Sequence, residues 1–258
     1  MKTFFLSLWA GILLNCNITF ATENLPLNFH NPDWWKTATL EDVVKEINQG
    51  ADIHAKDKDN TTPLMFACTY STKLENIIFL INYGAKVSEI NSFGQTPLMY
   101  ASMNNDNHKI ITTLIKHGAK VNQTNNIKAT PLMLASLHNT NPNIIKTLLN
   151  NGADIHYQDK KGMDALKVAC MNNSNEEVII TLLKNKARIN QADKHGFTPL
   201  MLAAISNPNP KVVQVLLQRG ANPNMVSSMN KTALDYAKDN PKLFETPAYW
   251  ELHNLTLQ

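Results

Sequence analysis

Residues 198–222 read TPLMLAAISNPNPKVVQVLLQRGAN, and this stretch decides the fold. Thr198 is a good helix N-cap, because its hydroxyl can accept a hydrogen bond from an unpaired amide of the first turn. Pro199 then takes the first helical position, where its missing N–H is not needed. Two apolar-rich segments follow, separated by the turn residues 207–210. Gly220 ends the second segment in a left-handed conformation that a Cβ would strain. The stretch therefore predicts a helix-turn-helix unit.

The same unit recurs at a period of 34 residues without an insertion. The capping triplet stands at Thr62-Pro63-Leu64, Thr96-Pro97-Leu98, Thr130-Pro131-Leu132, Asp164-Ala165-Leu166, Thr198-Pro199-Leu200 and Thr232-Ala233-Leu234. The helix-ending pair stands at Gly50-Ala51, Gly84-Ala85, Gly118-Ala119, Gly152-Ala153, Lys186-Ala187 and Gly220-Ala221. An alanine three residues after the leucine keeps the same register and lets neighbouring repeats approach closely. Repeats that keep one period along the chain predict a solenoid, in which each repeat packs only on its neighbours.

The motif T-P-L-x-x-A, followed by h-h-x-x-L-L-x-x-G-A-D-[IV]-[NH], resembles the ankyrin repeat over roughly residues 34–240. Ankyrin repeats usually have 33 residues and tetratricopeptide repeats 34, but the landmarks of the latter are absent. We expect the extra residue in the turn between the two helices, where Asn141-Pro142-Asn143 occurs. The 34-residue spacing with Asn-Pro turns is similar to bacterial ankyrin arrays. The resemblance implies an all-α ankyrin repeat solenoid with a hairpin-like loop in each repeat.

The ends of the chain divide into short segments. Residues 1–21 are predicted to be a signal peptide, 22–33 a linker, 34–245 the repeat domain and 246–258 a C-terminal capping helix. In the N-terminal cap, Thr39 with Asp42 three residues later predicts a capping box. At the other end Thr246 and Pro247 predict a helix start, and Trp250, Leu252 and Leu255 are expected to cover the last repeat.

The signal peptide is inferred from three features of residues 1–21. Lys2 supplies the positive start, residues 4–14 are apolar or small, and small residues precede a cut after Ala21. Two alternatives stay open: a membrane anchor, for which the run is short, and lipidation of Cys16, whose preceding residues fit poorly. The prediction is an exported chain, periplasmic or secreted, with no membrane span after cleavage.

Composition and spacing argue against several classes of function. The chain is 43% hydrophobic and 17% charged with a net charge of +3, and its lysines are interspersed with acidic residues, so no nucleic acid is expected. No cysteine–histidine cluster has zinc spacing and no glycine-rich phosphate loop occurs. The repeats leave no room for a catalytic domain. We therefore expect no enzyme activity, no metal and no cofactor.

Two pairs of chemically interesting residues lie three repeats apart, which is about 25–30 Å at the usual spacing of packed helices. Cys68 and Cys170 are therefore expected to be separate buried thiols, because a disulfide needs Cα atoms within about 7 Å. His54 and His156 are likewise too far apart to share a metal. We expect the residues of their column, which include Asn122 and Asn190, to brace one loop against the next.

The resemblance implies partner contacts at the loop tips and at two positions late in each first helix. The candidate residues are Thr69, Tyr70, Met103, Asn104, Leu137, His138, Met171, Asn172, Ile205 and Ser206 on the helices, and Phe93, Ile127, Lys161, His195 and Met229 at the tips. The apolar row of Met103, Leu137, Met171 and Ile205 has two interpretations, a partner-binding stripe or core, of which core is favoured. The tips have little to pack against, so their apolar residues are expected to be exposed.

Departures from the pattern are few. Lys186 stands where the other repeats have a helix-ending glycine, and Lys128 stands where neighbouring loops have Gly94 and Gly162. We expect the third loop to be shaped differently. The favoured function is a monomeric, non-enzymatic scaffold that binds another protein in the periplasm or outside the cell. The alternative is a secreted effector that binds a host protein.

Overall fold

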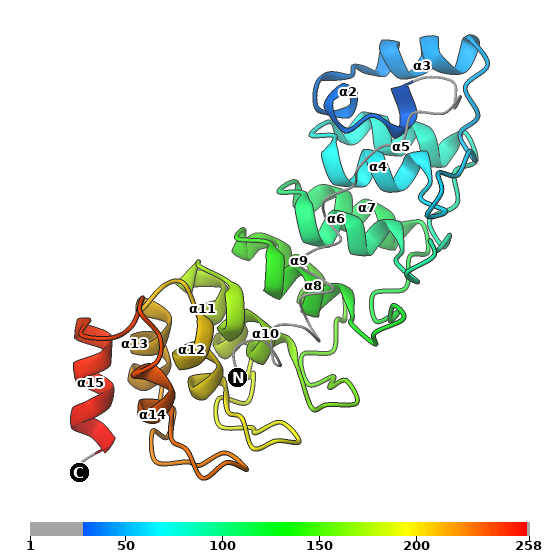
Figure 1. The fold of residues 1–258 in the computed structure, drawn as a ribbon. Coiled ribbons are helices and arrows are strands. Elements are labelled where there is room, and N and C mark those ends of the chain that lie inside the picture. Colours follow the sequence, from blue (N-terminus) through cyan, green and yellow to red (C-terminus); the bar gives the residue numbers. More distant parts are fainter. Residues whose placement is uncertain (1–27, 257–258) are drawn as a thin grey trace.

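The computed structural model describes residues 28–256, which form a curved stack of helix pairs (Figure 1). The inner helices are α4 (Pro63–Tyr70), α6 (Pro97–Asn104), α8 (Pro131–His138), α10 (Ala165–Asn172), α12 (Pro199–Ser206) and α14 (Ala233–Ala237). The outer helices are α5 (Leu74–Asn82), α7 (His108–Lys116), α9 (Pro142–Asn150), α11 (Glu176–Lys184), α13 (Lys211–Gln218) and α15 (Pro247–Thr256). Over these described residues no strand occurs, and the predicted all-α solenoid is confirmed.

The predicted helix caps are present. The amide of Met201 donates to the Thr198 hydroxyl at 3.2 Å, and Thr62, Thr96 and Thr130 cap their helices in the same way. Asp164 also caps its helix, accepting from the amide of Lys167 at 2.9 Å. The helix-ending glycines have positive φ, and Lys186 shares this left-handed backbone with a φ of 70°. Lys186 thus adopts the conformation of the glycines it replaces, although a Cβ is disfavoured there.

The core runs unbroken through the stack. Inner helices pack on inner helices, and outer helices pack on outer helices. The alanine column of the inner helices is buried, as the close approach of neighbouring repeats requires. Cys68 and Cys170 are free thiols and both are fully buried, so the prediction of two separate buried thiols is confirmed. Burial raises the pKa of both thiols, which keeps them protonated and unreactive.

Asparagines at the inner-to-outer helix turns form a repeated hydrogen-bond ladder between neighbouring repeats. The side-chain amide of Asn139 donates to the carbonyls of Ser102 (3.3 Å) and Asn105 (3.1 Å) in the preceding repeat. Its oxygen accepts from the amide of Asn141 at 2.8 Å. The same role falls to Asn105, Asn173 and Asn207, all of them buried. This buried column satisfies carbonyls that the ends of the inner helices would otherwise leave unpaired.

A second asparagine column runs beside the first and caps the outer helices. Asn141 accepts from the amide of Asn143 at 3.0 Å and donates to the carbonyl of Asp106, 35 residues earlier, at 3.0 Å. The equivalent residues Asn107, Asn175 and Asn209 make the same pair of bonds. The expected turn is shorter than predicted in this repeat, because Asn141 caps α9 whereas Pro142 and Asn143 are its first helical residues. The asparagines of this column link the repeats as well as capping the helices.

The N-terminal cap begins earlier than predicted. A 3-10 helix, η1 (Asn28–His30), and helix α2 (Pro32–Thr37) precede α3 (Leu40–Asn48). Phe29 is 1% exposed and stacks on Trp35, whose indole N–H donates to the Phe29 carbonyl at 2.8 Å. The prediction of a linker is thus wrong for residues 28–33, because Phe29 anchors them to the first repeat. The predicted capping box of Thr39 and Asp42 is confirmed. The predicted signal peptide, 1–21, lies outside the described residues.

The C-terminal cap covers the last repeat with a different helix face from the one expected. Thr246 caps α15 as predicted, accepting from the amide of Tyr249 at 3.3 Å. Leu252 is fully buried and Tyr249 nearly so. Trp250 and Leu255 are instead 49% and 38% exposed, so their predicted role is wrong. Tyr249 and Leu252 lie three positions apart and share one helix face, whereas Trp250 and Leu255 project elsewhere.

Candidate partner-binding surface

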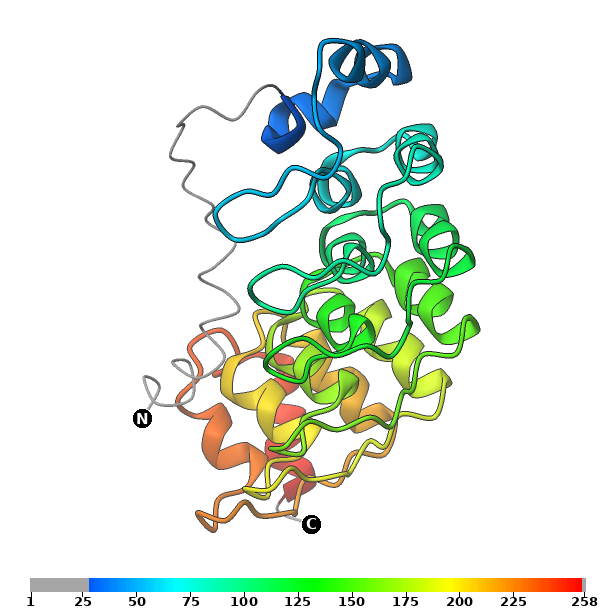
Figure 2. The ribbon, with the colours of Figure 1, turned by 90° about the vertical axis from the view of Figure 1, so that its right-hand side faces the viewer.

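The loops that join each outer helix to the next inner helix all project along one edge of the stack (Figure 1), and the rotated view in Figure 2 shows the same loops. We call them fingers 1 to 6, comprising residues 51–61, 85–95, 119–129, 153–163, 187–197 and 221–231. Each tip is a tight turn of four residues. In finger 2 the amide of Gly94 donates to the Asn91 carbonyl at 2.9 Å, and the amide of Asn91 donates to the Gln95 carbonyl at 3.1 Å.

Finger 3 has the same internal shape as its neighbours, contrary to the prediction. The amide of Lys128 donates to the Asn125 carbonyl at 2.9 Å, and its φ of 67° matches the 73° of Gly94. The hydrogen bonds of the turn therefore hold Lys128 in the left-handed conformation despite its Cβ. Finger 3 differs instead in its backbone hydrogen bonding to finger 4.

Neighbouring fingertips are joined by single backbone hydrogen bonds. The amide of Asn126 donates to the Phe93 carbonyl at 3.1 Å, and equivalent bonds join fingers 1 and 2, 4 and 5, and 5 and 6. Among the described residues, no backbone bond links Lys160 of finger 4 to Ile127 of finger 3. At Gly162 and Gly196 a Cβ would lie 3.1 Å or less from the backbone of the next finger. Lys128 has such a Cβ, but so does Asn60 of finger 1, where the amide of Ser92 still donates to the Asp59 carbonyl at 2.8 Å, so the Cβ alone does not account for the missing bond after finger 3.

The first residue of each tip holds the turn from inside. One carboxylate oxygen of Asp159 accepts from the amides of Lys161 (2.8 Å) and Met163 (2.9 Å). Asp193 accepts in the same way from the amides of His195 and Phe197, each at 2.8 Å. These side chains make the local bonds that favour Asp and Asn in turns. The acidic groups of fingers 4 and 5 are therefore directed inward, beneath the tip.

The apolar tip residues are exposed, as predicted. The exposed fractions are 41% for Phe93, 48% for Ile127 and 43% for Met229. His195 is also exposed, and Lys161 is half-buried. Exposed large apolar side chains at loop tips are typical of interaction sites when they gather on one edge. The tips thus meet the physical requirement for partner contacts.

The candidate partner-binding residues on the inner helices, which we call the helix row, divide between core and surface. Thr69, Met103 and Leu137 are 8%, 5% and 4% exposed, so their assignment as partner-binding residues is wrong and the core interpretation holds for them. Thr69 donates its hydroxyl proton to the Met65 carbonyl within its own helix. Met171 and Ile205 are half-buried, as is Tyr70, which packs on Phe66. No continuous apolar stripe remains along the inner helices.

The polar positions of the helix row stay accessible. Asn104, Asn172 and Ser206 are exposed, although Ser206 donates to the Met171 carbonyl of the preceding repeat at 2.9 Å. His138 is half-buried, and its burial lowers the pKa of the imidazole. Removing the charged form from water is unfavourable, so this ring is a neutral donor or acceptor at pH 7. These side chains can supplement contacts made at the tips.

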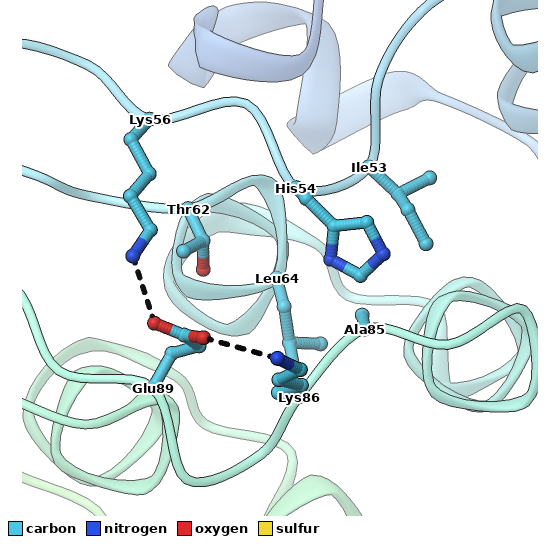
Figure 3. A pocket seen from close by; sticks show the side chains of 8 residues that line it. All are labelled: Ile53, His54, Lys56, Thr62, Leu64, Ala85, Lys86 and Glu89. Atoms are coloured by element: carbon cyan, nitrogen blue, oxygen red, sulfur yellow. Dashed lines mark hydrogen bonds and ion pairs between the residues drawn. The ribbon is translucent and has the colours of Figure 1, made fainter.

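A hollow of about 160 Å³ lies where fingers 1 and 2 meet the start of α4 (Figure 3). Ile53, Leu64 and Ala85 line it together with charged groups. Glu89 lies between two lysines, with its carboxylate 2.9 Å from Lys56 Nζ and 3.9 Å from Lys86 Nζ. The hydrogen bond from Lys56 lowers the pKa of Glu89. The charge of Glu89 in this hollow is therefore already matched by the two lysines.

The His54 column braces the fingers at two places, as predicted. Asn122 donates to the Gly152 carbonyl and accepts from the amide of Asp154, each at 2.9 Å. Asn190 makes the equivalent bonds to finger 6. His54 instead turns its ring toward the hollow (Figure 3). Within residues 28–256 no cluster of three or more metal-ligating side chains occurs, and no helix is long and apolar enough to span a bilayer.

One buried charge pair was missed by sequence reasoning. Lys167 is fully buried, and its ammonium lies 2.6 Å from the carboxylate of Asp164. The equivalent positions in four other repeats are methionine after threonine, as in Thr62 with Met65. Both residues therefore depart from the pattern together in the fourth repeat. A paired departure at i and i+3 was the signal that could have revealed the ion pair.

The repeats and the helix pairs now point to one family. The sequence profile of ankyrin repeats, described as three copies, matches residues 36–125 and again 132–227. This chain belongs to the ankyrin repeat family. Its fold is also similar to the ankyrin repeat domain of human ASB11, with a TM-score of 0.69 and 25% sequence identity over 83% of this chain and 92% of that one. No curated protein sequence matches the chain significantly. Ankyrin repeats indicate a scaffold for protein–protein interaction.

Proposed function

We propose that this ankyrin repeat protein is an exported, monomeric scaffold that binds its partner protein along the fingertip edge. The observation that carries the proposal is the exposure of Phe93, Ile127 and Met229, large apolar side chains at the same tip position of three fingers. The inner-helix row cannot serve as an apolar site, because Met103 and Leu137 are buried. Hot spots of interfaces are enriched in large side chains that become desolvated on binding.

Export rests on the sequence of residues 1–21 alone, and N-terminal sequencing of the purified chain tests it. We expect the mature chain to begin at Thr22 and to be recovered from the periplasm or the medium. A full-length chain in the cytosol would overturn export. Recovery from the cytosol of a host cell would favour the alternative, a secreted effector that binds a host protein.

The binding edge is tested by chemical cross-linking and capture from the native compartment. The F93A/I127A/M229A variant should lose the partner that the unchanged chain captures. The matched control is Y83A/F244A/W250A, which removes three aromatic side chains that are 55%, 45% and 49% exposed but lie off the fingers. Equal capture by the fingertip variant, or loss only in the control, would overturn the proposed edge.

A further inference from the structure

The six fingertips differ in charge in a way that divides the edge into segments. The two central residues of each tip are Lys58-Asp59, Ser92-Phe93, Asn126-Ile127, Lys160-Lys161, Lys194-His195 and Ser228-Met229. Tips 2 and 3 are uncharged at these positions and carry exposed apolar side chains. Tips 4 and 5 carry three lysines, and Lys128 adds a fourth at the edge of tip 3. Apolar and basic segments therefore lie next to each other.

The four lysines of the basic segment are available to a ligand. Lys128, Lys160 and Lys194 are exposed and Lys161 is half-buried. None of the four forms an ion pair within the described residues. The aspartates of the same tips, Asp159 and Asp193, are directed inward onto backbone amides. The outward charge of this segment is consequently positive.

The backbone hydrogen bond that is missing between fingers 3 and 4 lies where the apolar segment meets the basic one. The amide of Lys160 has no backbone or side-chain acceptor within residues 28–256, whereas the equivalent amides of Asn126, Lys194 and Ser228 each donate to the preceding finger. A free backbone N–H beside ammonium groups adds a directed donor for a carboxylate or a carbonyl. Two independent features thus favour an anionic ligand at tips 3 to 5.

We infer that tips 2 to 5 bind an extended peptide segment of the partner in which apolar residues stand next to a run of acidic residues. The inference rests on the proposed function, since it specifies the partner of the same edge. Packed repeats are about 10 Å apart, and an extended chain rises about 3.3 Å per residue. About three partner residues therefore span one tip, and the whole segment comprises roughly nine to twelve residues.

Each part of the surface has a defined role in this complex. Apolar side chains of the peptide contact Phe93 and Ile127, and its carboxylates face the four lysines. A nucleic acid fits this edge less well, because the apolar side chains of tips 2 and 3 would offer nothing to its phosphates and the two central residues of these tips carry no charge.

Panning a phage-displayed library of random 16-residue peptides against the full chain tests the inference. Enriched sequences should combine an acidic run with adjacent apolar residues. The affinity of an enriched, fluorescein-labelled peptide is then measured by fluorescence anisotropy at 50 and 300 mM NaCl. Affinity should fall at the higher salt, because exposed charge pairs are screened.

Matched triple variants locate the site. K160E/K161E/K194E should weaken binding of the enriched peptide about tenfold or more. The control K116E/K146E/K184E makes the same change of charge at exposed lysines of the outer helices α7, α9 and α11 and should bind as the unchanged chain does. F93A/I127A should lower the affinity about fivefold to tenfold through the apolar half. Unchanged melting temperatures would exclude misfolding as the cause.

Several outcomes would overturn the inference. Enrichment of peptides without acidic residues would do so while leaving the scaffold function intact, as would equal affinity in the two charge-reversal variants or failure to enrich any peptide. Tighter binding of a labelled 20-nucleotide single-stranded RNA than of the enriched peptide would replace the peptide with a nucleic acid. The capture experiment with F93A/I127A/M229A fails or succeeds independently of these results.

Discussion

The two long edges of the solenoid follow opposite rules. On the turn edge the same residue recurs: Asn105, Asn139, Asn173 and Asn207 are buried and make the same bonds to the preceding repeat. On the opposite, fingertip edge (Figure 1) the backbone turn recurs, but its central side chains change from finger to finger. The turn edge therefore links its repeats through one repeated side chain, whereas the tips are linked through their backbone and leave their central side chains free to differ. Those side chains can change without altering the ladder.

The largest expected loss of stability comes from breaking the buried ion pair of the fourth repeat. Asp164→Thr keeps the helix cap that other repeats use but leaves the fully buried Lys167 ammonium without its counter-charge. We expect a loss of about 3–5 kcal/mol in the free energy of unfolding, measured by urea denaturation. The double variant D164T/K167M restores the Thr and Met of the other repeats and should recover the stability. A neutral effect of D164T alone would show that the pair contributes nothing.

The next largest loss of stability is expected from removing one asparagine of the ladder on the turn edge. Asn139→Ala removes the donor to two buried carbonyls and the acceptor for the Asn141 amide. The cost should be about 2–4 kcal/mol, because buried polar groups are left unpaired. Asn104→Ala is the control, since Asn104 is exposed one residue before a ladder asparagine. Urea unfolding that gave equal losses for both variants would contradict the ladder's role.

A smaller effect of the opposite sign is expected at Lys186. Its φ of 70° suits glycine, so Lys186→Gly should raise the free energy of unfolding by about 1 kcal/mol. Lys184→Gly is the matched control, because it places glycine in the last turn of α11 and should destabilise by a similar amount. Differential scanning calorimetry of the two variants checks the signs, and a lower melting temperature for K186G would refute the argument.

The smallest effect on stability is expected at the fingertips. F93A/I127A removes side chains that are 41% and 48% exposed, so the free energy of unfolding should change by no more than about 0.5 kcal/mol per residue. The same variant is expected to impair partner binding. Thermal unfolding followed by circular dichroism separates the two properties. A substantial loss of stability would mean that the tips help to hold the stack, and the contrast between the edges would fail.

Much of the fold could be predicted from the sequence because each repeat contains the residues that start and end its own helices. Thr198, Pro199 and Gly220 mark helix ends through local physics, and the fixed period places the cysteines without any structure. The place of Lys186 in a column of helix-ending glycines was visible in the sequence, and its backbone is left-handed like theirs. These inferences needed only the residue and its neighbours in the chain.

The failures concern contacts between segments distant in sequence. Asn207 was recognised as a turn residue, but its side-chain amide reaches carbonyls 34 and 37 residues earlier. Phe29 was assigned to a linker because its stacking on Trp35 is not a local signal. At the candidate site, tip exposure was predictable and core was the favoured interpretation for Met103, whereas the burial of Thr69 was not foreseen. The inward orientation of Asp159 was likewise invisible in the sequence.

The asparagine ladder also bears on how such a chain changes length. Every rung between Asn105 and Asn207 is made of the same atoms at the same spacing of 34 residues. Tandem duplication or loss of one whole unit would leave each amide facing an equivalent carbonyl, while an insertion of any other size would strand one. The gene can therefore lengthen or shorten in steps of one repeat, and each added finger would bring a new tip for selection to act on.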